Sequence, residues 1–283
     1  MRIAFASGKG GTGKTTLATN MAAVLAAVET GISYIDADVE EPNGQIFLSP
    51  VVRDIIDVKV PVPIIDEGRC NLCGICADVC HYNAVAILGK KAMVFDSLCH
   101  SCGACFVLCP EKAISERQRS IGTITCGRTG KADFIAGCLS VGEALSPPLI
   151  RMVKNMISDE RTAIIDAPPG TSCPVVEAVK GCDFVVLVTE PTPFGLNDLE
   201  LAFGMLEEMH IKCGVVINRS DLGDPSIKKR IEEKGMKILM EIPFCRKTAE
   251  AYSNGVLNSR IDPVFADMMK RLYEIIGQEV NHG

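Results

Sequence analysis

Short apolar runs alternate with helix-like stretches over most of this chain. Several apolar runs have the length and continuity of strands that are buried on both faces of a sheet. They lie at residues 2–7, 32–36, 162–166, 184–189, 213–218 and 237–242. The stretches with a helical pattern lie at residues 14–29, 175–180, 197–210, 226–234 and 262–276. Strands that alternate with helices predict an α/β fold with a doubly wound, mostly parallel sheet.

One interval, residues 59–117, does not follow this alternation. Cysteines dominate it, and residues 70–88 resemble residues 99–114, as expected of a duplicated small module. A module of this size cannot bury a sufficient core without a metal to hold it together. We therefore divide the chain into a first α/β part at 1–58, an inserted α+β module at 59–117 and a second α/β part at 118–283.

Composition and charge exclude several classes of protein. The chain has 283 residues, a net charge of −6 and no long basic run, so nucleic acid is not an expected partner. No apolar stretch is long enough to cross a membrane, and the N-terminus leads into a glycine loop without room for a signal peptide. The 14 cysteines are unevenly clustered, which favours metal ligands in a reducing cytoplasm over disulfides.

A glycine-rich loop with the pattern G-x-x-x-x-G-K-[ST] follows the first predicted strand and precedes the first predicted helix. Backbone N–H groups of such a loop surround phosphate oxygens at the positive end of the helix. Lys14 would reach the β- and γ-phosphates, and the Thr15 hydroxyl would bind Mg²⁺. A turn without function is a weak alternative because the flanking elements fit. The predicted phosphate-binding residues are Gly8, Gly10, Gly11, Thr12, Gly13, Lys14, Thr15 and Thr16.

A lysine directly after the first glycine, Lys9, is redundant for holding a nucleotide in its own chain. With Lys9 the loop resembles the deviant loop of the ParA, MinD and nitrogenase iron protein superfamily. The resemblance implies a homodimer in which Lys9 contacts the partner's nucleotide. Asp36 and Asp38 resemble the second acidic motif of that family, which implies that Asp38 positions the attacking water.

Two further segments carry the same resemblance. The segment Asp-Ala-Pro-Pro-Gly-Thr that begins at Asp166 resembles the family's switch II. This implies that Asp166 lies near Mg²⁺ and that Gly170 senses the γ-phosphate. Asn218, at the end of a predicted strand, resembles the asparagine that contacts adenine. The resemblance therefore implies an ATPase that uses ATP and Mg²⁺, with Lys9, Lys14, Asp38 and Asp166 as catalytic residues.

The clustered cysteines form two runs with spacings of two, two and three residues, as in bacterial ferredoxins. In such runs three thiolates bind one [4Fe–4S] cluster and the fourth binds the other. Zinc is the alternative, but repeated runs with this spacing fit zinc sites poorly. The predicted ligands are Cys70, Cys73, Cys76 and Cys109 for one cluster, and Cys99, Cys102, Cys105 and Cys80 for the other.

Cys138 and Cys173 lie outside these runs. Cys173 follows the switch II segment, and both its place and its spacing from Cys138 resemble the cluster cysteines of the nitrogenase iron protein. The resemblance implies one further [4Fe–4S] cluster, bridging two chains. The alternative for this pair is buried thiols or a transient metal site. The default for the other cysteines is inert core, and they are Cys126, Cys182, Cys213 and Cys245.

Together these features predict an ATP-driven electron-transfer protein. The inserted ferredoxin-like module would take electrons from a donor, and the bridging cluster would pass them to an acceptor metalloenzyme. The alternative is an Mrp-type ATPase that assembles or delivers clusters to apo-proteins. A MinD-like positioning ATPase is a third class. The final helix, residues 263–280, carries too many acidic residues for a membrane anchor and is expected to pack on the domain.

Overall fold

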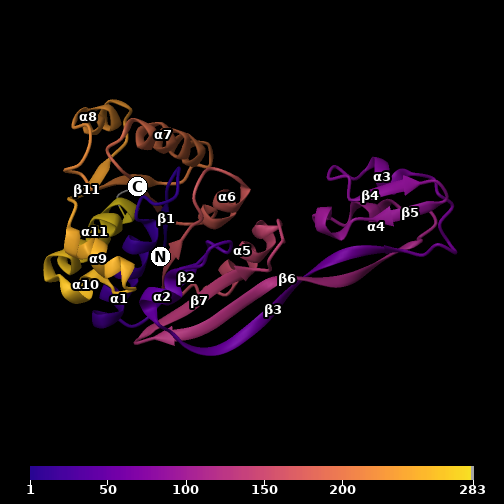
Figure 1. The fold of residues 1–283 in the computed structure, drawn as a ribbon, viewed down its shortest axis with the longest axis horizontal. Coiled ribbons are helices and arrows are strands. Elements are labelled where there is room, and N and C mark those ends of the chain that lie inside the picture. Colours follow the sequence, from indigo (N-terminus) through magenta and orange to yellow (C-terminus); the bar gives the residue numbers. More distant parts are fainter. Residues whose placement is uncertain (282–283) are drawn as a thin grey trace.

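The computed structural model describes residues 1–281, and its main body is a sheet with helices on both faces (Figure 1). In spatial order the strands are β11-β10-β9-β1-β8-β2-β7-β6-β3. The strands from β11 to β7 are parallel, and β6 pairs antiparallel with both β7 and β3, so the predicted mostly parallel sheet is confirmed. The strands are β1 (Arg2–Ala6), β2 (Ile32–Asp36), β3 (Val51–Ile65), β6 (Ile114–Thr129), β7 (Ala132–Leu139), β8 (Thr162–Asp166), β9 (Phe184–Thr189), β10 (Cys213–Asn218) and β11 (Ile238–Ile242).

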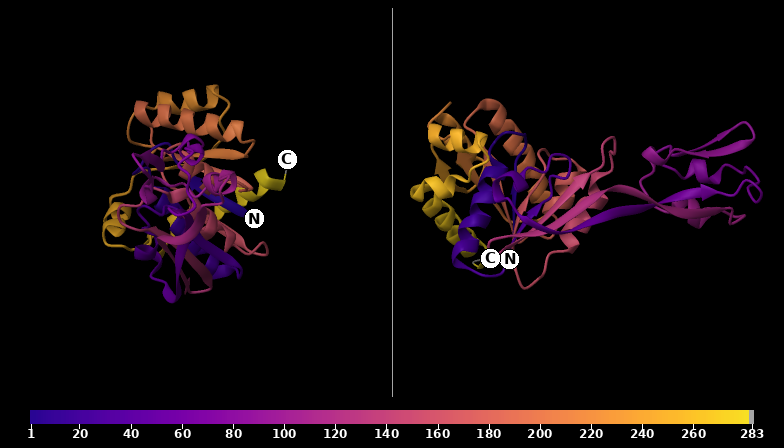
Figure 2. Two further views of the ribbon diagram at one scale, coloured as in Figure 1. Left: turned by 90° about the vertical axis from the view of Figure 1, so that its right-hand side faces the viewer. Right: turned by 60° about the horizontal axis from the view of Figure 1, so that its bottom comes forward.

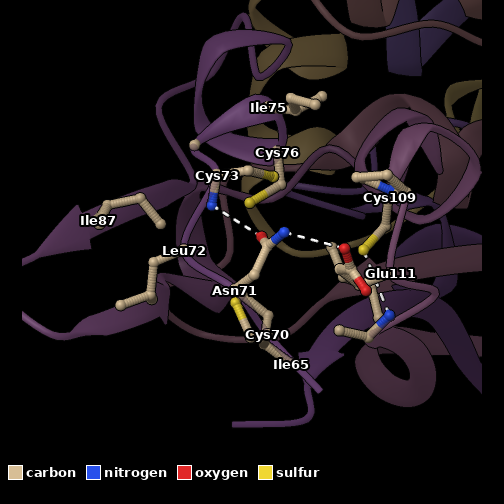
Figure 3. Close-up of a pocket in the computed structure, with 14 residues that line it drawn as sticks. Ile65, Cys70, Asn71, Leu72, Cys73, Ile75, Cys76, Ile87, Cys109 and Glu111 are labelled. Carbon is tan, nitrogen blue, oxygen red and sulfur yellow. Dashed lines mark hydrogen bonds between the residues drawn. The ribbon is translucent and has the colours of Figure 1, made fainter. Parts of the chain in front are cut away.

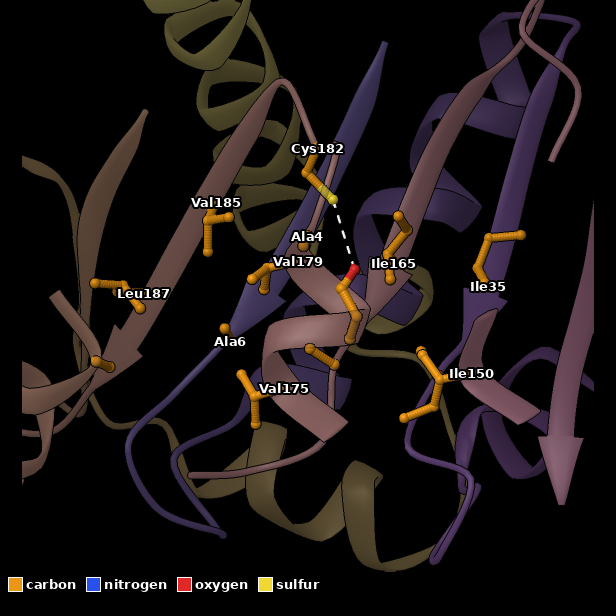
Figure 4. Packing of buried hydrophobic residues seen from close by; sticks show 14 of the residues in the cluster. Ala4, Ala6, Ile35, Ile150, Ile165, Val175, Val179, Cys182, Val185 and Leu187 are labelled. Atoms are coloured by element: carbon orange, nitrogen blue, oxygen red, sulfur yellow. Dashed lines mark hydrogen bonds between the residues drawn. The ribbon is translucent and has the colours of Figure 1, made fainter. Parts of the chain in front are cut away.

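Helices cover the two faces of this sheet in separate layers, which makes the fold doubly wound. One layer packs α1, α10 and α11 on side chains such as Ile3 and Phe5, and the other packs α5 to α8 on Ala4 and Ala6. Figure 4 shows α6 in the second layer, with Val175 and Val179 facing the strands. The helices of the main body are α1 (Lys14–Val28), α2 (Gly44–Leu48), α5 (Ser146–Asn155), α6 (Cys173–Val179), α7 (Pro193–Glu208), α8 (Ser226–Glu233), α9 (Arg246–Ser253), α10 (Asn258–Ile261) and α11 (Pro263–Asn281).

The final helix α11 packs on the domain, as predicted. It buries Phe265, Met269, Leu272 and Ile276 against the first layer. Among residues 1–281, no helix is both long and apolar enough to span a membrane.

A long two-stranded ribbon carries the cysteine-rich segment away from the main body (Figures 1 and 2). The ribbon consists of β3 and β6, which pair along their length from Val51 to Ile65. At its far end lies a small unit, here called the cysteine module, at residues 66–113. It contains α3 (Ile75–Asp78), β4 (Val85–Leu88), β5 (Lys91–Val94), the short 3₁₀ helix η1 (Asp96–Leu98) and α4 (Ala104–Leu108).

The ribbon strands are elements that the sequence pattern did not predict. The positions 59 and 117, taken as ends of the insertion, lie inside β3 and β6, where Lys59 pairs with Ser120 and Val62 pairs with Arg117. Much of the ribbon is exposed to solvent, so charged residues and prolines replace the apolar alternation of a half-buried strand. The chain enters and leaves the cysteine module along one continuous antiparallel pair.

Close packing fixes the segment that follows β2 against β7. Gly137 of β7 is buried, and a Cβ atom there would lie 2.6 Å from Val39 Cγ1 and 2.8 Å from Val153 Cγ2. The backbone N–H of Leu139 donates to the Val39 carbonyl oxygen at 2.8 Å, which extends β2–β7 pairing beyond the strand. The absence of a side chain at position 137 therefore allows the two segments to meet.

We expect Gly137→Ala to lower the free energy of unfolding by about 1–3 kcal/mol, because the added methyl group overpacks a filled site. Gly204→Ala is the matched control: it lies within α7, and a Cβ atom there meets nothing within 4 Å. The control should raise stability by about 0.5–1 kcal/mol, since alanine favours helix. Urea unfolding measures both, and equal stabilisation by the two variants would contradict the packing described.

Candidate functional site

The glycine-rich loop connects β1 to α1, and two of its glycines are required by close contacts. A Cβ atom at Gly8 would lie 2.1 Å from the carbonyl oxygen of Asp198, on α7. A Cβ atom at Gly13 would lie 2.4 Å from Asn218 Nδ2, and Gly13 has a φ of 103°, in the left-handed region. The loop is therefore held between α7 on one side and the end of β10 on the other.

Asn218 holds the loop through its side-chain amide. Its Nδ2 donates to the Thr12 carbonyl oxygen at 2.8 Å, and its Oδ1 accepts from the Arg219 backbone N–H at 3.0 Å. Both ends of the amide are therefore engaged within the chain. In this structure Asn218 braces the phosphate loop.

Two buried carboxylates lie side by side next to the loop. Asp36 and Asp166 end the adjacent parallel strands β2 and β8 and are direct partners in register. The Gly44 N–H donates to Asp36 Oδ2 at 2.9 Å, and the Tyr34 hydroxyl donates to Asp166 Oδ2 at 3.3 Å. Within residues 1–281 the Oδ1 atom of each aspartate has no hydrogen-bond partner.

Burial raises the pKa of both aspartates. The pKa of Asp36 lies well above its usual range because of burial and the neighbouring Asp166 charge. Burial raises the pKa of Asp166 to about 6, although the Thr15 hydroxyl and Lys14 lower it. Two carboxylate oxygens without partners, beside the Thr15 hydroxyl, are hard oxygen donors of the kind that Mg²⁺ prefers. The donor set at this point fits Mg²⁺.

Lys14 and Asp38 form the charged wall of the same region. Lys14 is 6% exposed, and burial lowers its pKa in spite of the nearby Asp166 and Asp38 charges. Burial also raises the pKa of Asp38 to about 6, with Lys14 acting in the opposite direction. A buried ammonium group is strongly stabilised when an anion binds next to it. The burial of Lys14 therefore favours phosphate binding at this position.

A cavity of about 580 Å³ joins these groups to the helices near the C-terminus. The predicted residues that line it are Gly10, Gly11, Gly13, Lys14, Thr15, Thr16, Asp38 and Asn218. Asp36 and Asp166 are not part of its lining. The far wall comes from β11 and α9 to α11 and includes Pro243, Tyr252 and Asn258. Nothing in the sequence pattern identified this wall, because its residues carry no motif.

Lys9 and Gly170 lie outside the cavity lining. The Lys9 ammonium is 3.8 Å from a carboxylate oxygen of Glu190 in the same chain. The Gly170 N–H donates to the Ser7 carbonyl oxygen at 2.9 Å, and Gly170 has a φ of 95°. The segment that begins at Asp166 is thus attached to the base of the phosphate loop.

The cysteine module brings its eight run cysteines together in two cavities. One cavity contains the four thiols of the first predicted set, and Figure 3 shows them around a common space. Next to them Asn71 Oδ1 accepts from the Cys73 N–H, and Asn71 Nδ2 donates to Glu111, each at 3.0 Å. The second cavity contains the second predicted set. The sets are Cys70, Cys73, Cys76 and Cys109, and Cys80, Cys99, Cys102 and Cys105.

The two cavities lie at successive levels of the ribbon. Pro61 and Pro63 of β3 line the second cavity, whereas Ile65 lines the first. The second cavity is therefore the nearer one to the main sheet. Among the described residues, no group of three or more His, Cys, Asp or Glu side chains is placed to hold a single metal ion. The four thiols of each cavity are thus spread around a shared space rather than gathered on one point, and a [4Fe–4S] cluster takes one thiolate per iron.

Cys138 and Cys173 are both exposed, which distinguishes them from core thiols. Cys138 lies in β7, where it pairs with Thr123 of β6. Cys173 is the first residue of α6. By contrast, Cys182 is buried and burial raises its pKa to about 11, as expected of an inert core thiol. Cys245 lines the large cavity, a position that the sequence did not predict.

Comparison with known proteins gives a consistent result. The profile of the CobQ/CobB/MinD/ParA nucleotide binding domain matches residues 3–258. An uncharacterized protein of Methanocaldococcus jannaschii is 30% identical over 265 residues, which is 90% of each chain. An iron-sulfur cluster carrier protein of Pyrococcus abyssi is 25% identical over 90% of this chain and 78% of its own length.

A solved structure shows the same fold. MinD of Pyrococcus horikoshii, a septum site-determining protein in complex with Mg-ADP, superposes with a TM-score of 0.59 and 18% identity. The match covers 96% of this chain and 93% of MinD. Together with the loop between β1 and α1, the buried Lys14 and the paired aspartates, these matches show that the chain belongs to the CobQ/CobB/MinD/ParA family of nucleotide-binding P-loop ATPase domains.

Proposed function

We propose that the protein is an ATP-hydrolysing iron–sulfur cluster carrier that acts as a homodimer. The observation that carries the proposal is the pair of exposed cysteines, Cys138 and Cys173. Cys173 lies on the segment that follows Asp166, and Cys138 is the neighbour of Leu139, which is hydrogen-bonded to the segment that follows Asp38. Relatives named as cluster carriers support it. On this proposal two chains supply four thiolates to one [4Fe–4S] cluster, which is the cargo.

The chain's own groups have distinct tasks in ATP hydrolysis. The loop N–H groups and Lys14 bind the phosphates, and Asp38 orients the attacking water. Thr15, Asp36 and Asp166 would hold Mg²⁺, which would neutralise the charge that develops on the phosphates. Lys9 reaches the nucleotide of the partner subunit, after leaving Glu190. Burial of Lys14 keeps these interactions strong, because little water screens them.

The nucleotide site and the exposed cysteines are joined by short backbone connections. Val39 follows Asp38 directly, and its carbonyl oxygen accepts from Leu139, the neighbour of Cys138. In the segment after β8, Gly170 is hydrogen-bonded to the base of the phosphate loop and lies three residues before Cys173. A change of nucleotide that moves either segment therefore moves a cluster ligand.

The cysteine module supports a second candidate function, electron transfer. Its two cavities each contain four thiols, the donor set that [4Fe–4S] clusters require, and they lie in line along the ribbon. As a ferredoxin-like domain the module would hold two resident clusters that pass electrons. The donor and the acceptor metalloenzyme or apo-protein would then be separate proteins that dock at the two ends of this line.

Lys14→Ala should abolish ATP hydrolysis, with a loss of at least about a hundredfold, because the phosphates lose their buried cation. Transfer of iron and sulfide from the loaded protein to an apo-ferredoxin should then no longer respond to ATP. Lys229→Ala, an exposed lysine on α8, is the matched control and should behave as the wild type.

The same assay separates the two candidate functions. Cluster delivery requires that iron leaves the wild-type protein when ATP is added. In a parallel assay the protein is first reduced with dithionite and the acceptor is a cluster-containing, oxidised ferredoxin. If this acceptor is reduced in an ATP-dependent manner while all iron stays bound to the protein, electron transfer is the function. Transfer at the same rate with and without ATP would contradict the carrier proposal.

Cys138→Ala should remove one cluster per dimer. Two chains with two module clusters each hold about 16 iron atoms, and a bridging cluster raises this to about 20. Anaerobic iron and acid-labile sulfide analysis should therefore give about 20 for the wild type and about 16 for Cys138→Ala. Cys126→Ala, at a half-buried thiol of β6, should retain about 20. Equal iron contents for the wild type and Cys138→Ala would show that Cys138 does not hold a bridging cluster.

A further inference from the structure

The large cavity extends well beyond the groups that bind phosphate. Its charged end is formed by the phosphate loop and Asp38, and its other end by β11 and helices α9 to α11. At that second end the lining includes the apolar side chains of Phe244, Tyr252 and Met268. Phe244 is 43% exposed and Tyr252 is 44% exposed. The Tyr252 ring packs against Phe47, with 4.8 Å between the ring centroids, and the exposed parts of both rings remain for a flat ligand.

One buried polar side chain in this apolar wall has no hydrogen-bond partner among residues 1–281. Asn258, at the start of α10, is 1% exposed and lines the cavity. Neither its Nδ2 nor its Oδ1 atom has a hydrogen-bond partner within residues 1–281. Burying an amide with both ends unsatisfied costs free energy, so such a group indicates a missing ligand.

The position of Asn258 is fixed by hydrogen bonds that do not use its side chain. The next residue, Ser259, donates its backbone N–H to Asn20 Oδ1 at 2.8 Å, and Asn20 Nδ2 donates to the Thr16 carbonyl oxygen at 2.7 Å. Thr16 belongs to the first turn of α1, directly after the phosphate loop. The unpartnered amide is therefore held in a fixed relation to the loop that binds the phosphates.

The asparagine first expected to contact the base is in a different situation. The Asn218 amide makes one hydrogen bond at each end, to the Thr12 carbonyl oxygen and from the Arg219 N–H, and retains one N–H and one lone pair. Asn218 thus fixes the phosphate loop, whereas both ends of the Asn258 amide, in the same cavity, are without a partner among residues 1–281.

We propose that Asn258 is the residue that reads the adenine base of the nucleotide. An asparagine amide pairs with adenine through two bonds, accepting from the N6 amino group and donating to N7. Guanine presents two acceptors on the same edge, so one of them would face the amide oxygen. The apolar wall supplies stacking for the purine ring. This inference rests on the nucleotide chemistry proposed above and adds the group that selects the base.

The test is the affinity of the full-length protein for Mg-ADP and Mg-GDP, measured by calorimetry for the wild type and Asn258→Leu. The wild type should prefer ADP. Asn258→Leu should bind ADP about tenfold or more weakly and lose this preference, because leucine fills the space without hydrogen bonds. Its melting temperature without nucleotide should be unchanged or higher, since an unsatisfied buried amide is removed.

Two other asparagines serve as controls. Asn254→Leu changes an exposed residue of the same region that does not line the cavity, and it should leave both affinities unaltered. Asn218→Ala removes the brace of the phosphate loop, so it should weaken ADP and GDP binding by similar factors.

Each other outcome overturns a defined statement. If Asn258→Leu binds ADP as well as the wild type does, a water satisfies the amide and Asn258 does not read the base. Equal weakening of ADP and GDP together with a lower melting temperature assigns Asn258 a purely structural role. If the wild type binds neither nucleotide, the ATPase proposal itself fails, and the base assignment fails with it.

Discussion

The parallel register of β1, β8 and β2 is the constraint on which the rest of the site depends. Phe5, Asp166 and Asp36 occupy one level across these strands, so the chain turns into the phosphate loop beside both aspartates. Ending two adjacent buried strands in carboxylates is costly, and burial accordingly raises the pKa of both. The hydrogen bonds from Gly44 and Tyr34 offset part of this cost and leave one oxygen of each carboxylate for a cation.

The same edge of the sheet connects the nucleotide site to the exposed thiols. The segment after β2 carries Asp38 and then joins β7 through Val39, next to Cys138. The segment after β8 passes Gly170 and reaches Cys173 at the start of α6. Each of these two segments is only a few residues long and is closely packed, as at Gly137. A displacement of either segment at the nucleotide site is therefore transmitted to the neighbouring cysteine.

The ribbon gives the cysteine module a different relation to the ATPase body. Residues 66–113 are attached through β3 and β6, whose outer halves are paired mainly with each other. A partly buried ion pair between Arg119 of β6 and Glu143 links the ribbon to the loop after β7. Hydrogen bonds from Arg119 and from the Leu145 N–H help to hold the pKa of Glu143 below its usual value, against burial. This ion pair therefore holds the ribbon against the segment that follows Cys138.

The sequence by itself determined the parallel sheet, the phosphate loop and the cysteine runs, because each depends on short-range patterns. Buried parallel strands require continuous apolar runs, and a phosphate loop requires glycines at fixed spacing. The hydrophobic pattern did not predict the ribbon, because its strands are largely exposed to solvent and need no alternation of apolar and polar residues. Only the tertiary structure placed Cys138 on a strand, engaged both ends of the Asn218 amide and left Asn258 unpartnered in the cavity. Hydrogen-bond satisfaction depends on groups distant in sequence, and no local pattern records it.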